Sequence, residues 1–221
     1  YIFALPNIWN VLQNTVTIAV AKIILGLVVP VVVALMLNEL QSRKLQRALQ
    51  TIIYFPHFLS WIILATILAD LLSPTTGLVN QMLNALGMDS IFFMGDNRYF
   101  QGTLIWTEVW KEFGYGTVVY MATITGIDPT LYEAAAIDGA NRWQQTWHIT
   151  LTGLRMIIIL MMVLSLGNVL NAGFDQVFNM YSEVVYSSGD ILDTLMYRVG
   201  LESAKFGPAT AVGLLKSVIS A

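Results

Sequence analysis

The sequence predicts an all-α polytopic membrane protein, and three observations support this fold class. First, 56% of the 221 residues are hydrophobic and only 11% are charged, whereas about 25% of the residues in soluble domains are charged. Second, the mean hydropathy is +0.66. Third, the apolar residues form continuous runs of about twenty, without the alternation that is typical of a membrane β-strand. Most of this apolar surface is therefore expected to face lipid.

Five apolar segments are candidates for transmembrane helices, which need about 20 residues to cross roughly 30 Å of hydrocarbon. Pro30 is expected to kink the first segment, and Pro56 lies inside the second. The fifth segment is still apolar at Ala221, and the opening residues resemble a loop that leads into a helix, so both ends are expected to be truncated. The predicted spans of this single transmembrane domain, residues 1–221, are 14–40, 50–72, 103–127, 154–174 and 206–221.

Positive charges in the short loops predict the orientation of the chain. The loop between the first two spans carries Arg43, Lys44 and Arg47 and no acidic residue, as is typical of the cytoplasmic side. The loop after the second span and the segment after the fourth are more acidic than basic, so both are predicted outside. The segment 128–152, between the third and fourth spans, then lies on the cytoplasmic side.

Segment 128–152 has the composition of two short helices. Asp128 can cap a helix, Pro129 suits its first turn, and three consecutive alanines follow. Gly139 is expected to end this helix, because glycine adopts a left-handed conformation without steric cost. A second helical piece, over about residues 141–149, would lead into the fourth span. The two pieces would form a compact surface that a cytoplasmic partner could contact.

The spacing within this segment resembles the EAA motif of the inner-membrane permease subunits of ABC importers. The residues that carry the resemblance are Glu133, Ala134, Ala135, Gly139, Ile149 and Leu151. The family usually has proline after the leucine, whereas this chain has Thr152. Four further stretches resemble the carbohydrate branch, the LplB-like oligosaccharide and polysaccharide permeases: TIIYFPHFLSW, ATITGIDPTLYEAAAIDGA, LNAGFDQVF and DTLMYRVGL.

The resemblance implies a type I ABC importer transmembrane domain in the bacterial cytoplasmic membrane, with five of its six spans visible here. It implies a second permease subunit, usually a different one, two cytoplasmic ATPase subunits, and an extracytoplasmic protein that delivers a sugar. Glu133 would face a basic group of the ATPase, Ala134 and Ala135 would line the contact, and Gly139 would permit the turn. This chain contains no Gly-rich phosphate loop ending in Lys-Ser/Thr, so ATP hydrolysis is assigned to partners and no cofactor is expected.

Two alternatives remain open on the residues alone. Segment 128–152 could rest on lipid headgroups as an interfacial amphipathic helix, and the chain could be a standalone secondary carrier or a membrane enzyme. A carrier or an enzyme would need a buried acid–base relay or inverted repeats, and neither is evident. The chain has no cysteine, and its two histidines, His57 and His148, are far apart, so no metal site is expected. A net charge of -3 without a basic cluster argues against nucleic acid as a partner.

Aromatic and amide side chains inside the spans are candidates for a substrate path. Aromatic rings can stack on pyranose faces, although they also form interfacial belts, and amides can both donate to and accept from sugar hydroxyls, although they also join helices. In the third span the candidates are Trp106, Trp110 and Tyr115. In the fourth span they are Ser165, Asn168 and Asn171, whose spacing by three predicts one helical stripe.

Charged residues inside the spans are expensive in hydrocarbon and are therefore also functional candidates. Lys111 is expected to pair with Glu108 three residues earlier on the same helix, with Glu112 beside it. Lys22 is expected to form an ion pair with another helix. His57 is interpreted as a packing residue rather than a proton carrier.

Overall fold

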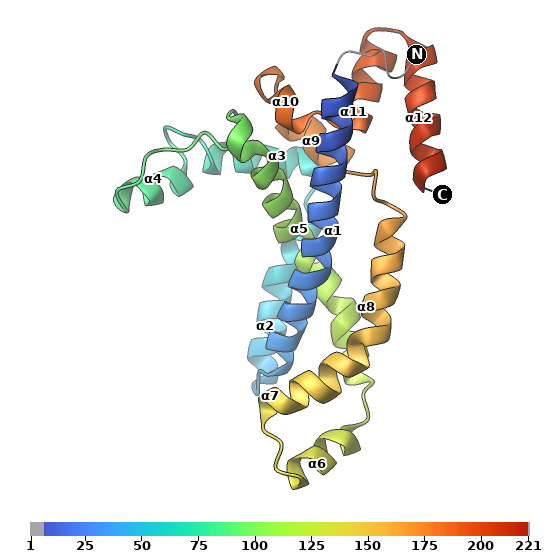
Figure 1. The fold of residues 1–221 in the computed structure, drawn as a ribbon. Coiled ribbons are helices and arrows are strands. Elements are labelled where there is room, and N and C mark those ends of the chain that lie inside the picture. Colours follow the sequence, from blue (N-terminus) through green and yellow to red (C-terminus); the bar gives the residue numbers. More distant parts are fainter. Residues whose placement is uncertain (1–6, 221) are drawn as a thin grey trace. The chain divides into compact units, whose positions relative to one another are not determined.

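The computed structural model describes residues 7–220, and within this range every regular element is a helix. This confirms the predicted all-α class. The longer helices, labelled in Figure 1, are α1 (Ile8–Asn38), α2 (Arg43–Tyr54), α3 (Trp61–Leu71), α4 (Leu78–Ala85), α5 (Asn97–Thr125), α6 (Pro129–Ile137), α8 (Leu151–Leu166), α9 (Phe174–Met180) and α12 (Phe206–Ser220). The short helices are α7 (Arg142–Gln145), α10 (Tyr186–Gly189) and α11 (Leu192–Tyr197), and 3-10 or π-helical turns occupy Phe55–Phe58, Thr146–Thr150, Glu183–Val185 and Arg198–Glu202.

The chain divides into two compact units, and the division falls inside α1 and α5. Among the described residues, the first unit contains 7–22, Leu59–Glu108 and 167–220, and so includes α3, α4 and α9 to α12. The second unit contains Ile23–Phe58 and Val109–Leu166, and so includes α2 and α6 to α8.

The first unit has two clusters of buried apolar side chains. One joins the start of α1 to α3, α5 and the segment after α8, and its members include Ile18, Leu64, Phe100, Val177 and Ile191. The other joins the first turns of α1 to α11 and α12, and includes Ile8, Val11, Leu192, Leu195 and Val212. Because lipid tails are as apolar as these side chains, close van der Waals packing within such clusters holds membrane helices together.

The second unit is held together by the C-terminal halves of α1 and α5 and the start of α8. Its buried members include Val31, Leu37, Tyr120, Ile124 and Leu154. The two long helices approach closely where Gly116 faces Pro30, because a Cβ atom on Gly116 would lie 3.1 Å from the proline ring. α1 continues as a helix through Pro30, and Thr117 Oγ1 donates a 3.4 Å hydrogen bond to the Pro30 carbonyl.

Within residues 7–220, two helical stretches are long and apolar enough to cross a bilayer, namely Ile8–Asn38 and Arg142–Leu166. A third candidate is a bent pair, Arg43–Phe58 with Trp61–Leu71. α5 has 29 residues but includes three charged side chains near its middle, and α12 has 15 residues. The division into five spans therefore stays a prediction.

The predicted second span is not one continuous helix, because it consists of two helical stretches with a break between them. α2 ends at Tyr54, and the next four residues, which include Pro56, tighten into a 3-10 turn before α3 begins. Proline lacks an N–H group and its ring clashes with the preceding turn. One carbonyl at this break, that of His57, accepts a 3.0 Å hydrogen bond from Lys111 Nζ.

The predicted fourth span is helical only in its first part, since α8 stops at Leu166. The irregular segment that follows begins at Gly167 and ends at Gly173, and α9 starts at Phe174. Gly173 has a φ angle of +90°, which glycine adopts without strain. The helix therefore ends at Leu166, before the predicted end of the span at residue 174, and the irregular segment has a glycine at each end.

Candidate functional site

Segment 128–152 begins with a capped helix, as the sequence predicts. Asp128 is the N-cap of α6, and its Oδ1 atom accepts a 2.9 Å hydrogen bond from the backbone N–H of Thr130. Pro129 occupies the first turn. The hydrogen bond from the Thr130 backbone, followed by that of its side chain, lowers the pKa of Asp128 below its ordinary value of 3.8. The cap stays ionised at neutral pH and satisfies a free donor of the helix.

The end of α6 at Gly139 is also as predicted. Gly139 has a φ angle of +81°. Its N–H donates to the carbonyl of Ala136 (3.1 Å), and the N–H of Ala140 donates to the carbonyl of Ala135 (2.9 Å). These two bonds form a Schellman motif, in which a left-handed residue closes the helix. The chain therefore reverses at a rigid, hydrogen-bonded corner.

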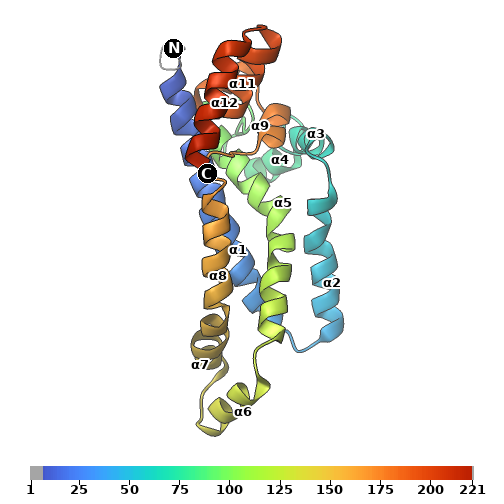
Figure 2. The same cartoon turned by 90° about the vertical axis from the view of Figure 1, so that its right-hand side faces the viewer.

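The second helical piece starts at Asn141 and continues into α8. Asn141 and Gln144 form a capping box, with hydrogen bonds of 2.8 and 2.9 Å. α7 passes into the π-helical turn Thr146–Thr150 and then into α8 without an intervening loop. Tyr132 on α6 and Thr150 share a hydrogen bond of 2.9 Å between their hydroxyl groups. Figures 1 and 2 show α6 and α7 as a pair of short helices joined by a turn, with α7 leading into α8.

The structure brings together only part of the predicted set of coupling residues. Ala135, Gly139 and Ile149 line one open hollow of about 290 Å³. Glu133 and Ala134 are exposed on α6, outside the lining of this hollow. Leu151 lies in a different groove, of about 420 Å³.

A residue that the sequence analysis did not select ties α1 to this segment. Glu39, at the end of α1, accepts hydrogen bonds from Thr146 Oγ1 (3.0 Å) and Arg142 Nη1 (3.4 Å). An apolar groove beside these contacts is lined by Val32, Leu35, Met36, Trp143, Trp147 and Leu151. Glu39 and Arg142 are far apart in the sequence, so no local sequence pattern indicates that they form a pair.

The three aromatic candidates of the predicted substrate path lie on α5, and all are exposed in this chain. Trp106 belongs to the first unit and contributes to a surface hollow with Tyr99, whereas Trp110 and Tyr115 belong to the second unit. The Tyr115 ring stacks on the imidazole of His57, with centroids 4.1 Å apart and an angle of 5° between the planes.

The amide candidates do not form the predicted helical stripe. Ser165 is on α8, where its hydroxyl donates a 2.7 Å hydrogen bond to the Met161 carbonyl. Asn168 and Asn171 lie in the irregular segment after α8, so a spacing of three does not align them on a helix face. The prediction of one stripe was wrong because the helix breaks at Gly167.

The charged residues inside the spans form interhelical contacts. Lys22 on α1 pairs with Glu108 on α5 at 3.6 Å, which confirms the expected pair with another helix. Lys111 Nζ lies 2.8 Å from Oε1 of Glu112, its neighbour on α5. The same ammonium donates a 3.0 Å hydrogen bond to the carbonyl of His57 in the segment after α2, and the expected pair with Glu108 stays a prediction.

No group of three or more side chains that could hold a metal ion occurs in the part of the chain that the structure describes.

Comparison with known proteins identifies the family. Residues 26–219 match the family described as "Binding-protein-dependent transport system inner membrane component". The chain belongs to this family. This permease is 37% identical to protein LplB of Bacillus subtilis (strain 168) over 217 residues, which are 98% of this chain and 68% of LplB. It is 35% identical over 218 residues to the polygalacturonan/rhamnogalacturonan transport system permease protein YteP of the same organism, with 99% and 68% coverage.

Solved structures agree with this assignment. The permease matches a chain of a bacterial ABC transporter involved in the import of the acidic polysaccharide alginate, with a TM-score of 0.94, 37% identity, and coverage of 99% of this chain and 76% of that chain. It matches the bacterial alginate ABC transporter in complex with alginate pentasaccharide-bound periplasmic protein with a TM-score of 0.95 and the same identity and coverage. These likenesses confirm the predicted type I ABC importer fold.

Family membership also confirms the predicted location and role. The permease is a multi-pass component of the bacterial inner membrane and a transport subunit, while ATP hydrolysis belongs to separate subunits. A binding-protein-dependent transporter of this type contains ATPase subunits, a second permease and a binding protein, as the sequence resemblance implied. The alternative of a standalone carrier or membrane enzyme is thereby rejected.

Proposed function

We propose that this permease imports an oligosaccharide or polysaccharide by alternating access, and that segment 128–152 couples it to an ATPase subunit. The carbohydrate assignment is supported by the names of its relatives. YteP is described as a polygalacturonan/rhamnogalacturonan permease, and the similar solved transporter imports alginate. Similarity at 35–37% identity over nearly the whole chain supports the same class of cargo.

The coupling role is supported above all by the corner at Gly139. A surface that transmits force must keep its shape under load, and α6 is fixed at both ends, by the Asp128 cap and by the hydrogen bonds at Gly139 and Ala140. Glu133 and Ala134 remain exposed beside the hollow that Ala135, Gly139 and Ile149 line. Glu133 and Ala134 on α6, with the hollow beside them, would receive a protruding group of the ATPase.

Movement at this surface can pass directly to the other helices of the second unit. α7 continues through a π-helical turn into α8, and Thr150 in that turn bonds to Tyr132 of α6. Glu39 links the end of α1 to Arg142 and Thr146. Closure of the ATPase pair would therefore shift α6, α7 and the connected ends of α1 and α8 together, as in a rigid-body switching transition.

The predicted substrate path becomes part of the same proposal. Trp106, Trp110 and Tyr115 are exposed on α5 and could meet sugar rings. Ser165, Asn168 and Asn171 could contact hydroxyl groups, although from a helix end and an irregular segment rather than from one helical stripe. The five predicted spans would provide the surrounding membrane domain.

The coupling proposal is tested by Gly139→Val in the complete reconstituted transporter. A β-branched residue at φ +81° is strained, at a cost of about 1–2 kcal/mol, and would distort the corner. We expect ATP hydrolysis to continue while sugar uptake falls, with the permease still inserted. Gly87→Val is the matched control, because Gly87 has a φ angle of +79° but lies after α4. Equal uptake by the Gly139 variant and the unmodified transporter would refute the coupling role.

The carbohydrate proposal is tested by ATPase stimulation. The reconstituted complex with its binding protein would be given pentasaccharides of alginate, of galacturonan and of an uncharged mannan, each at several concentrations. We expect at least one to stimulate ATP hydrolysis and to accumulate inside proteoliposomes. Stimulation by a panel of amino acids or peptides instead, with no response to the three saccharides, would contradict the proposed cargo.

A further inference from the structure

A compact polar cluster forms in the second unit where α5 meets the break after α2. His57 Nδ1 lies 2.7 Å from Oε2 of Glu112, and Lys111 Nζ lies 2.8 Å from Oε1 of the same carboxylate. Lys111 Nζ also donates to the His57 carbonyl at 3.0 Å. Both oxygens of Glu112 are thus fixed, one by each neighbour, and the carboxylate has a defined orientation.

The members of this cluster differ in exposure. The Lys111 side chain is 8% exposed, whereas those of His57 and Glu112 are 28% and 37% exposed. Glu112 lies near the middle of α5, which covers the predicted third span. Ionisable side chains at such depth almost always face the bundle interior or a water-filled cavity, because their exposure to hydrocarbon is costly. The open side of Glu112 therefore faces water or a partner protein rather than lipid tails.

An aromatic surface adjoins the exposed carboxylate. Tyr115 follows Glu112 by three positions on α5, so the two share a helix face. One face of the Tyr115 ring packs on His57, yet the residue is 54% exposed. Phe58, which is also exposed, meets the His57 ring edge-on at 5.4 Å. A fixed hydrogen-bond acceptor beside an open aromatic ring matches a sugar, which has hydroxyl groups at its edge and an apolar ring face.

We propose that His57, Glu112 and Tyr115 form a saccharide subsite on the translocation path. Glu112 accepts hydrogen bonds from sugar hydroxyl groups, and Tyr115 packs against the apolar face of the sugar ring. Lys111 is a positioning residue that holds the Glu112 carboxylate and the broken end of the α2 segment together. This inference rests on the proposed function, since it assigns contacts for the same carbohydrate cargo, and it adds His57 and Glu112 to the predicted set.

The first test measures access from water. The chain has no cysteine, so Tyr115→Cys provides a single thiol in a complex whose other subunits lack reactive cysteines. We expect a charged methanethiosulfonate reagent to label this thiol. The pentasaccharide that stimulates ATP hydrolysis in the carbohydrate test should slow the labelling at least about threefold. Ile159→Cys on α8 is the control, because Ile159 is also exposed in this chain but its exposed neighbours, among them Leu160 and Val163, are apolar. If the thiol of the Tyr115→Cys variant does not react, then lipid or the second permease covers position 115, and this overturns the proposal.

The second test measures recognition of the sugar. With the same pentasaccharide, Glu112→Gln should raise the KM of uptake about tenfold or more, because a hydrogen bond to a charged group is lost, with a smaller change in kcat. Tyr115→Leu should raise the KM, and Tyr115→Phe should retain it, since the ring and not the hydroxyl packs on the sugar. Asp89→Asn, at an exposed carboxylate after α4, is the control and should leave the KM unchanged.

The outcomes separate this inference from the proposed function. If a pentasaccharide stimulates ATP hydrolysis but the Glu112 and Tyr115 variants keep the KM of the unmodified transporter, the subsite alone is overturned. If no saccharide in the panel stimulates ATP hydrolysis, the carbohydrate proposal and the subsite both fail. This holds even if the thiol of the Tyr115→Cys variant reacts.

Discussion

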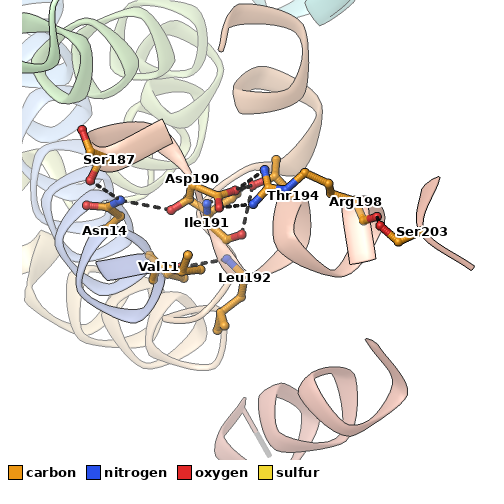
Figure 3. Close-up of polar contacts among 10 residues, drawn as sticks. Val11, Asn14, Ser187, Asp190, Ile191, Leu192, Thr194, Arg198 and Ser203 are labelled. Carbon is orange, nitrogen blue, oxygen red and sulfur yellow. Dashed lines mark hydrogen bonds and ion pairs between the residues drawn. The ribbon is translucent and has the colours of Figure 1, made fainter. Parts of the chain in front are cut away.

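The Nη2 atom of Arg198 lies 2.5 Å from the Oδ2 atom of Asp190, in a segment that the sequence marks only as an acidic external loop. Figure 3 shows this pair within a network that reaches α1. Thr194 Oγ1 donates to Asp190 Oδ1 (2.8 Å), and Asn14 Nδ2 donates to the Asp190 carbonyl (3.2 Å). Burial by itself would lower the pKa of Arg198, but the hydrogen bond and the charge of Asp190 outweigh it, and the pKa lies above its ordinary value. The segment that contains Asp190 and Arg198 is therefore a folded part of the first unit.

Arg198→Ala should destabilise the first unit strongly. Asp190 is only 4% exposed. Removal of one partner from a buried ion pair costs about 3–5 kcal/mol, because it leaves an uncompensated charge. Arg198 is partly exposed, so we expect a loss of stability at the low end of this range. Thermal unfolding of the purified permease in one detergent would measure the change. Arg98→Ala, at an exposed arginine in the first turn of α5, is the control, and an equal loss of stability in both variants would contradict the assigned role.

Lys22→Met should loosen the irregular segment after α8. Lys22 Nζ donates to the Ala172 carbonyl (2.6 Å) and to Gln176 Oε1, and it pairs with Glu108. Methionine preserves most of the length of the side chain but removes these contacts, with an expected cost of about 3 kcal/mol or more. Thermal unfolding and proteolysis of the segment would both report the change.

The double variant Lys22→Met with Glu108→Met separates charge pairing from packing. If the pair matters as such, the double variant should recover part of the stability that the single Lys22 variant loses, since it removes both members of the ion pair. Lys205→Met, at an exposed lysine before α12, should be close to neutral. A double variant less stable than the sum of the two single changes would show that the ion pair is not the stabilising contact.

The coupling segment was predictable because its determinants are local. Asp128 precedes a proline and a run of helix-forming residues, and Gly139 stands where the helix must end; both signals act within a few residues of the bond they form. The helix bounds, the cap and the left-handed glycine were all predicted correctly. Their role in docking an ATPase stays a prediction, since it came from a family resemblance.

The rest of the site depends on contacts between distant positions, for which one sequence carries little signal. Lys111 pairs with Glu112 beside it and also donates to the carbonyl of His57, a residue that is far away in the sequence. Ser165, Asn168 and Asn171 have the spacing of one helix face, but the helix ends before Gly167. The hydrogen bond from Lys22 to the Ala172 carbonyl also favours an irregular segment there. Tertiary contacts thus override the local pattern where the chain breaks.

The Asp128 cap should give α6 a pH dependence in acid. Because the folded state lowers the pKa of Asp128, the stabilisation is fully present above the ordinary value of 3.8 and is lost as the pH falls through the lower, folded value. Hydrogen exchange of the α6 amides between pH 5 and 3, corrected for intrinsic rates, would measure it. Asp128→Asn keeps an acceptor but does not titrate, and the two chains are otherwise identical. Identical loss of protection in the two chains would assign the effect to another group.

Gly114→Ala should destabilise the second unit, while Gly102→Ala on the same helix should not. A Cβ atom at Gly114 would lie 1.9 Å from the carbonyl oxygen of Ile53 and 2.5 Å from its carbon, so α5 would have to move away from the backbone of α2. Overpacking of this kind costs about 1–3 kcal/mol. A Cβ atom at Gly102 would meet nothing within 4 Å, and alanine there should stabilise the helix by about 0.5–1 kcal/mol. Melting temperatures should therefore shift in opposite directions, and the Gly114 variant should also weaken uptake, because the segment that carries His57 follows Ile53 directly. Shifts of the same sign and size would show that the close approach of α5 to α2 does not stabilise this unit.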